Sequence, residues 1–167
     1  MPVNLLFLIF LVVKVVVACV FLGYASVLDV RFRRVCNCVW LCFFPLALGL
    51  SVFEFLFFGY SGVLFVFGCV LPAGFALACF YIGEFVCGGG FGGADAKCLV
   101  CLGVLFPFFP GTQLVGFVLM AFGMGSLVAL CVMAYRRKGV HVKIPLLPYI
   151  FAGFLILTLG VFLSLLF

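Results

Sequence analysis

The chain has 167 residues, of which 69% are hydrophobic and 8% charged, and its mean hydropathy is +1.58. This composition excludes an ordinary water-soluble domain and indicates an integral membrane protein. The net charge is +5, but the basic residues gather in groups beside the ends of apolar runs, which favours membrane orientation over nucleic-acid binding.

Polar residues, glycine and proline divide the chain into six apolar segments, and a membrane span takes about 20 such residues. In chain order the expected spans are Asn4–Leu28, Asn37–Phe57, Gly62–Val86, Asp95–Phe109, Gln113–Tyr135 and Leu146–Phe167. The fourth is short, about 22 Å at 1.5 Å per residue, so Asp95 is expected at the membrane boundary. We predict an all-α integral membrane protein with one membrane-embedded domain over 1–167.

Basic residues lie on alternate connections between these spans. They are Arg31, Arg33 and Arg34 after the first span, Lys97 after the glycine-rich segment, and Arg136, Arg137, Lys138 and Lys143 after the fifth span. The connections around Tyr60 and Pro110 carry no charge. By the positive-inside rule both termini lie outside, and Asp29 and Asp95 both face the cytoplasm.

The ten cysteines do not form a convincing metal or disulfide pattern. Half of them lie within long apolar runs, where a free thiol behaves as a small hydrophobe. Cys36, Cys38, Cys87 and Cys98 lie near polar segments, and whether they bind a metal stays open, although their spacing is not that of a zinc site. We expect no cofactor and no metal.

Two aspartates stand in polar motifs that the expected topology returns to the same face. Asp29 lies in "YASVLDVRFRRVCN", Tyr24 to Asn37, and Asp95 lies in "GGADAK", Gly92 to Lys97. Two carboxylates close together in a poorly solvated site tend to share one proton. The ionised group can then activate water while the protonated group donates to the oxyanion or leaving amine.

Each aspartate also has a simpler interpretation. Asp29 can be a helix-end residue paired with Arg31 or Arg33, and Asp95 can cap the fourth span. The glycines before Asp95 argue for more than a cap, because backbone without side chains can bend sharply and let an extended substrate approach closely.

These two motifs resemble those of type IV prepilin peptidases and archaeal preflagellin peptidases, which are GxGD-type membrane aspartyl proteases. "DVRFRRVCN" resembles their D-x-R-x-R-x-[IV]-P-N segment, "GGADAK" their G-x-G-D-x-K segment, and "VKIPLLPYIFAGFL" their last span. The resemblance implies that Asp29 and Asp95 are catalytic, with Gly92, Gly93, Ala94 and Lys97 as motif neighbours. It implies cleavage of a short charged leader from a pilin-like or archaellin-like precursor, just before its apolar helix.

The chain departs from the motifs at two positions. Cys36 replaces a proline that many members have, and Ala94 replaces the second glycine, as the archaeal branch tolerates. The chain also lacks the cytoplasmic insert with two cysteine pairs found in many bacterial members. We therefore expect a peptidase of archaeal type without N-methylation activity.

The remaining charged residues have structural and functional interpretations. Lys14 and Glu54 lie at similar depth in the first two spans and are expected to form an ion pair, with snorkelling as the alternative. Lys97 either steadies the aspartates or marks the boundary, and Glu84 is expected to be a structural partner. His141 is expected to be solvated. Arg31, Arg33 and Arg34 are possible substrate contacts, although topology alone accounts for them.

The predicted function is therefore an intramembrane aspartyl endopeptidase in the cell membrane, with its active site facing the cytoplasm. Its partners are a precursor with a charged leader and an apolar N-terminal helix, and membrane lipid, with no nucleic acid; the oligomeric state stays open. One alternative is a non-enzymatic transporter subunit that uses its acids for ion passage. Another is a presenilin-like GxGD protease, although "IPLLPYI" lacks the PAL sequence of that family.

Overall fold

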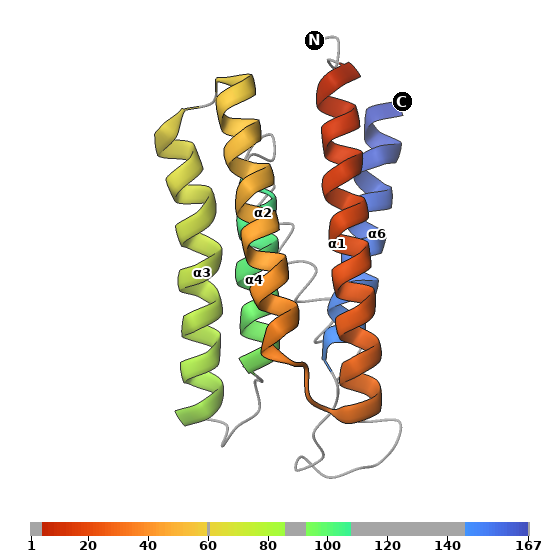
Figure 1. Ribbon diagram of the computed structural model, residues 1–167, viewed down its shortest axis with the longest axis vertical. Helices are drawn as coiled ribbons and strands as arrows, with labels where there is room; N and C mark the ends of the chain where they lie inside the picture. Colours follow the sequence, from red (N-terminus) through yellow and green to blue (C-terminus); the bar gives the residue numbers. More distant parts are fainter. Residues whose placement is uncertain (1–4, 60, 86–92, 108–145, 167) are drawn as a thin grey trace.

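The computed structural model describes residues 5–59, 61–85, 93–107 and 146–166, and all five elements in these ranges are α-helices (Figure 1). They are α1 (Leu5–Phe32), α2 (Asn37–Phe58), α3 (Gly62–Phe85), α4 (Gly93–Leu105) and α6 (Leu147–Leu166). The expected fifth span, Gln113–Tyr135, lies outside the described residues. The all-helical prediction holds for the described part of the chain, while six spans and the sidedness of the termini stay predictions.

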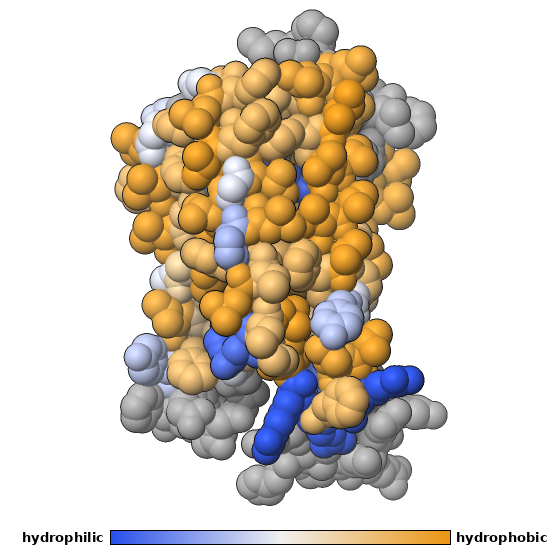
Figure 2. All heavy atoms as spheres, in the orientation of Figure 1, coloured by the Kyte–Doolittle hydropathy of each residue, from blue (hydrophilic) through white to orange (hydrophobic). Residues whose placement is uncertain are grey.

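The described surface is that of a membrane protein. Two helices, α1 and α2, are long and apolar enough to cross a bilayer, and Leu147–Gly160 of α6 forms a shorter apolar helix. Large apolar side chains such as Leu41, Leu56 and Leu71 are exposed along the helices. In Figure 2 apolar residues cover most of the visible face, and the strongly hydrophilic ones gather near its lower end. Such a continuous apolar surface suits a lipid environment.

The short helix α4 is central to the bundle and contacts each of the other four described helices. It packs most extensively against α3 and α2, while α1 packs against α6. Asp95, Cys98 and Leu99 of α4 are buried, and from Cys101 to Leu105 the helix is buried on all sides. The rest of the core comes from α1, α2 and α6, with Leu22, Phe43 and Phe154 fully buried.

All five helices have one end at the same side of the bundle, the lower side in Figure 1. At this side α1 and α3 end and α2, α4 and α6 begin. We call it the motif end, because both aspartate motifs lie there.

The first helix continues four residues beyond the expected boundary at Leu28 and ends at Phe32. Arg33 ends it by adopting a left-handed conformation, φ 51°, and its N–H donates to Asp29 O at 2.9 Å. Cys36 then takes an extended conformation at the N-cap position of α2, without a side-chain capping hydrogen bond. Asp29 therefore lies inside the last turn of α1, since a helix can continue past the end of its apolar run.

The fourth helix differs from the expected span, Asp95–Phe109, at both ends. It begins two residues earlier, at Gly93, and ends at Leu105. Pro107 accounts for the end, because proline disfavours helical backbone in the residue before it. The 13 residues of α4 are about 20 Å long, shorter than a hydrocarbon core of about 30 Å.

A close backbone contact holds the far end of α4 against α3. A Cβ atom added to Gly68 would lie 2.4 Å from Pro107 O and 2.8 Å from Pro107 Cα. Only glycine fits there without a shift of one backbone, so Gly68 sets how closely α3 approaches the chain after α4.

Candidate active site at the motif end

The carboxylate of Asp29 faces the first turn of α6. The N–H of Leu147, the first residue of α6, donates to Asp29 Oδ2 at 3.4 Å. The N–H groups of a first helical turn have no partner within their own helix, and the helix dipole favours negative charge there. Half-buried Asp29 therefore lies where backbone of another helix supports a carboxylate.

Asp95 lies in the first turn of α4 and is 8% exposed. Because α4 begins at Gly93, Asp95 is the third residue of the helix and not its cap. This position still favours a carboxylate through the helix dipole. Since α1 and α4 are in contact, the two aspartates lie on neighbouring helices at the same end of the bundle.

The two sequence motifs are joined by their last residues. Lys97 Nζ donates to Asn37 Oδ1 at 2.7 Å, so "GGADAK" and "DVRFRRVCN" are linked between the starts of α4 and α2. Sequence reasoning placed Lys97 either beside the aspartates or at the boundary and assigned no role to Asn37. The contact could have been predicted from the polar residue that ends each motif, Lys97 in one and Asn37 in the other.

The other residues of the predicted site fall around this link. Arg31, Arg33 and Arg34 are exposed at the end of α1. Ala94 is half-buried, and a Cβ at Gly93 would make an ordinary 3.8 Å contact with Phe80, so crowding does not require glycine there. Gly92, Cys87 and His141 lie outside the described residues, and the side chain of Glu84 is not described.

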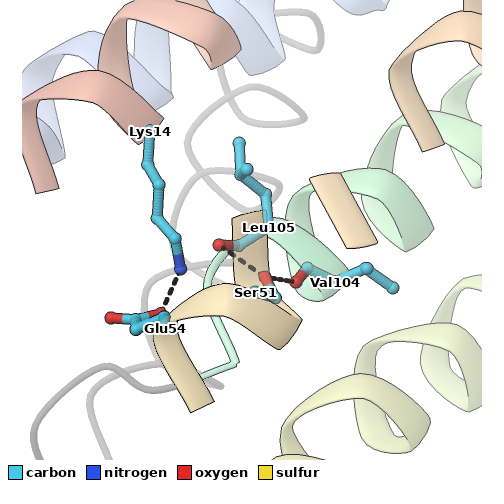
Figure 3. A network of polar contacts seen from close by, with 5 residues as sticks. All are labelled: Lys14, Ser51, Glu54, Val104 and Leu105. Atoms are coloured by element: carbon cyan, nitrogen blue, oxygen red, sulfur yellow. Dashed lines mark hydrogen bonds and ion pairs between the residues drawn. The ribbon is translucent and has the colours of Figure 1, made fainter. Parts of the chain in front are cut away.

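A second polar group lies far from the motif end, in the middle of the bundle. Lys14 Nζ of α1 donates to Glu54 Oε2 of α2, and the two side chains are 2% and 5% exposed (Figure 3). The Lys14 ammonium also lies 5.6 Å from the Phe10 ring centroid and 5.9 Å from that of Phe106. The pair matched by depth in the sequence is thus a buried ion pair.

Ser51, one turn before Glu54, ties α2 to the far end of α4. Its Oγ lies 2.5 Å from Val104 O and 3.2 Å from Leu105 O (Figure 3). The last carbonyls of a helix lack partners within that helix, and leaving them bare in an apolar interior is unfavourable. Ser51 therefore helps α4 to end inside the bundle, a role the sequence did not reveal.

Within the described part of the chain, no three His, Cys, Asp or Glu side chains are grouped as metal ligands. The described cysteines are free thiols: Cys19, Cys36, Cys38, Cys42, Cys69, Cys98 and Cys101. The described part of the candidate site contains carboxylates, a backbone N–H group and the Lys97–Asn37 contact.

The model of the type IV leader peptidase family matches residues 16–166, which include every described element of this site. The chain belongs to the type IV leader peptidase family. Comparisons with curated proteins and with solved structures gave no match. Family membership indicates a membrane protease of the prepilin peptidase type whose substrate is a pilin-type precursor. It therefore argues against the alternative that the chain is a transporter subunit.

Proposed function

We propose that this leader peptidase is an intramembrane aspartyl endopeptidase in which Asp29 and Asp95 form the catalytic pair. It removes the short charged leader of a pilin-like or archaellin-like precursor at the cytoplasmic face. The observation that carries the proposal is the Lys97–Asn37 hydrogen bond, which joins the two motifs that contain the aspartates. The contact between α1 and α4 supports the same pairing.

The proposed chemistry is general acid–base hydrolysis of one peptide bond. The ionised aspartate accepts a proton from water as the water oxygen attacks the carbonyl carbon, and the protonated aspartate donates to the carbonyl oxygen. The gem-diol intermediate then collapses: the aspartate that is now ionised takes a proton from one of its hydroxyls, the C–N bond breaks, and the leaving nitrogen takes the proton that the other aspartate accepted from water. The two carboxyl groups exchange roles through one shared proton.

Two further groups near Asp29 fit this chemistry. The Leu147 N–H supports the carboxylate, as described above. Ser26, one turn earlier on the same face of α1, is buried, and its Oγ has no hydrogen-bond partner among the described residues. We propose that Ser26 Oγ holds an ordered water on this side of α1, because an orphaned buried hydroxyl is usually satisfied by ordered water.

Asp29→Asn and Asp95→Asn test the catalytic pair. Each is expected to lower cleavage of a pilin-type precursor by at least about 100-fold, because neither amide can exchange the proton. The measurement is the mobility shift of the precursor on incubation with purified protein in detergent, with an unchanged thermal transition as the test of folding. Cys42→Ser, at an exposed residue of α2, is the control and should retain activity. Normal processing by either aspartate variant would refute the assignment.

We propose six spans in a single domain, as the apolar segments indicate, and the orientation of the motif end at the cytoplasmic face rests on the alternate basic connections. Arg31, Arg33 and Arg34 are proposed to contact the precursor from that side. Exposed Cys36 at the motif end provides a native probe. A membrane-impermeant maleimide should label Cys36 in inside-out vesicles but not in intact cells, and Cys36→Ser identifies the labelled position. Labelling only from outside would put the motif end on the wrong face.

A further inference from the structure

Three exposed thiols lie where the chain passes from α1 into α2. Cys36 occupies the N-cap position of α2, Cys38 lies in its first turn, and Cys42 follows one turn later. All three residues are exposed, whereas Cys98 and Cys101 of α4 are buried. Because a thiol must be accessible to react with a soluble oxidant, this cluster is where oxidation of the described cysteines is expected first.

The backbone places Cys36 and Cys38 at the spacing of a disulfide. Asn37, which lies between them, is the first helical residue of α2. Helical geometry sets the Cα atoms on either side of such a residue about 5.4 Å apart, and disulfides join Cα atoms about 4.4 to 6.8 Å apart. Cys36 itself is extended, with ψ 138°. Its side chain therefore does not follow the helical spacing that turns residues two apart away from each other.

Cys38 also influences the ionisation of Cys36. The N–H and the thiol of Cys38 favour the Cys36 thiolate and hold the pKa of the Cys36 thiol below its usual value. A neutral thiol has this effect only at short range, so the two sulfur atoms lie close together. The thiolate is the form that attacks oxidants. Cys36 is therefore the thiol that reacts first, and Cys38 is placed to react with its product.

Cys42 does not fit as the disulfide partner of Cys38. Residues four apart in a helix have Cβ atoms about 5 to 6 Å apart, whereas a disulfide needs about 3.5 to 4.5 Å. A shared metal ion is not favoured either, because no three metal-binding side chains are grouped in the part of the chain that the structure describes. Two exposed thiols at disulfide spacing, one of them favoured as thiolate, are typical of a redox-sensitive pair.

We propose that Cys36 and Cys38 are a redox-sensitive pair that hydrogen peroxide converts into an intramolecular disulfide. The Cys36 thiolate attacks a peroxide oxygen, the S–O bond forms as the O–O bond breaks, and the leaving hydroxide takes the proton that the Cys36 thiol released. The Cys38 sulfur then loses its proton and attacks Cys36 Sγ. The S–S bond forms as the S–O bond breaks, and this second hydroxide leaves as water with the proton from Cys38. Two thiols are oxidised and one peroxide is reduced to two waters.

The ring closed by this disulfide contains Asn37, whose Oδ1 accepts a hydrogen bond from Lys97. The modification thus lies beside the link between the two motifs, but its chemistry uses neither aspartate. It goes beyond the proposed function, and the failure of either proposal leaves the other standing. Cys38 also protects Cys36, because a disulfide can be reduced again whereas further oxidation to a sulfinic acid is in general irreversible.

Peroxide treatment of the Asp95→Asn protein in detergent tests the site without any cleavage. After equimolar hydrogen peroxide, free thiols are alkylated with iodoacetamide in denaturant. Trypsin with chymotrypsin then releases the peptide Val35–Trp40, which contains Cys36 and Cys38 but not Cys42. We expect this peptide to lose two hydrogens and take up no iodoacetamide, and to regain both alkylation sites after dithiothreitol. A doubly alkylated peptide, or a disulfide-linked dimer through Cys36, would overturn the proposal.

Two serine variants identify the resolving thiol. Under excess peroxide, Cys38→Ser leaves Cys36 without a partner for the disulfide, so Cys36 should proceed to its sulfinic acid, which dithiothreitol does not reduce. Cys42→Ser is the matched control, because Cys42 is also exposed on α2. Dithiothreitol should recover at least about tenfold less Cys36 thiol in Cys38→Ser than in Cys42→Ser. Equal recovery in the two variants, or loss of the disulfide in Cys42→Ser, would overturn the pairing.

Discussion

Lys14 Nζ donates a hydrogen bond to Glu54 Oε2 across the α1–α2 contact, and both side chains are almost fully buried. Burying two charges is unfavourable by itself, so the net contribution of such a pair to stability is small or even negative. Removing one partner is a different change, because it leaves the other charge in an apolar interior.

Lys14→Met and Glu54→Gln are each expected to lower the free energy of unfolding by about 2 to 4 kcal/mol. The double variant should recover most of this loss, since neither charge is then stranded. Thermal denaturation in detergent measures all three proteins, and the cycle isolates the interaction. Strictly additive losses would show that the two side chains do not depend on each other.

Leu147→Pro tests the support that α6 gives to Asp29. Proline is tolerated at the first residue of a helix but has no N–H to donate. Leu147→Ala is the matched control, because it also removes the buried side chain but keeps the N–H. The proline variant should have kcat for precursor cleavage about three- to tenfold below that of the alanine variant, with similar thermal stability. Equal kcat values would mean that the 3.4 Å contact does not matter for catalysis.

Gly68→Ala tests the close approach of α3 to the chain after α4. Its new Cβ meets backbone atoms of Pro107, which cannot move alone. We therefore expect the free energy of unfolding to fall by about 1 to 3 kcal/mol. Gly74→Ala in the same helix meets no atom within 4 Å and should be neutral, or more stable by about 0.5 to 1 kcal/mol. The measurement is the thermal transition of each variant in detergent. A similar change at both positions would argue against the contact.

Cys36 should react with thiol reagents at lower pH than an ordinary cysteine. The N–H and the thiol of nearby Cys38 favour the Cys36 thiolate, which holds the pKa of the Cys36 thiol below its usual value. A lowered pKa means that the thiolate, the reacting form, is present at lower pH. The pH profile of Cys36 alkylation by iodoacetamide, read by mass spectrometry, should therefore have its midpoint below that of the denatured protein.

Two substitutions separate the causes of this lowered pKa. Cys38→Ala removes only the thiol of Cys38 and should raise the midpoint for Cys36 in part. Cys38→Pro, in the first turn of α2 where proline is tolerated, also removes the N–H and should raise it further. Identical profiles for all three proteins would rule out this local cause.

Much of the fold could be predicted from punctuation in the sequence. Asn37 and Gly62 mark the starts of α2 and α3, as expected, because polar residues and glycine interrupt long apolar runs. Helix α1 continues four residues past the expected end of the first span, until Arg33 ends it through a left-handed backbone conformation. Helix α4 ends at Leu105, before the expected end of the fourth span at Phe109, because proline at 107 disfavours helical backbone in the residue before it.

The candidate site was less accessible to sequence reasoning. Lys14 and Glu54 lie at a similar number of residues from the turn between the first two spans, which predicted a similar depth in the membrane. The two side chains are in contact in the structure. The Asp29–Leu147 contact uses a backbone N–H, and Ser51 binds backbone carbonyls of α4. Neither contact leaves a signal in residue type, because any residue except proline carries the N–H and every residue carries the carbonyl.

The ion pair also has a consequence for how the protein is made. Lys14 and Glu54 are 40 positions apart, so a ribosome completes α1 well before it adds the partner of Lys14. A lysine at the centre of a membrane helix disfavours insertion by about 2.5 to 3.5 kcal/mol, and each surrounding Leu, Ile, Phe or Val offsets about 0.3 to 0.6 kcal/mol of this. Val, Leu, Ile and Phe dominate α1, so it can enter the bilayer with its charge unpaired. When α2 follows, Lys14 is already in the bilayer and can pair with Glu54 as it enters. The α1–α2 hairpin is therefore the first unit of the nascent chain in which these two charges neutralise each other.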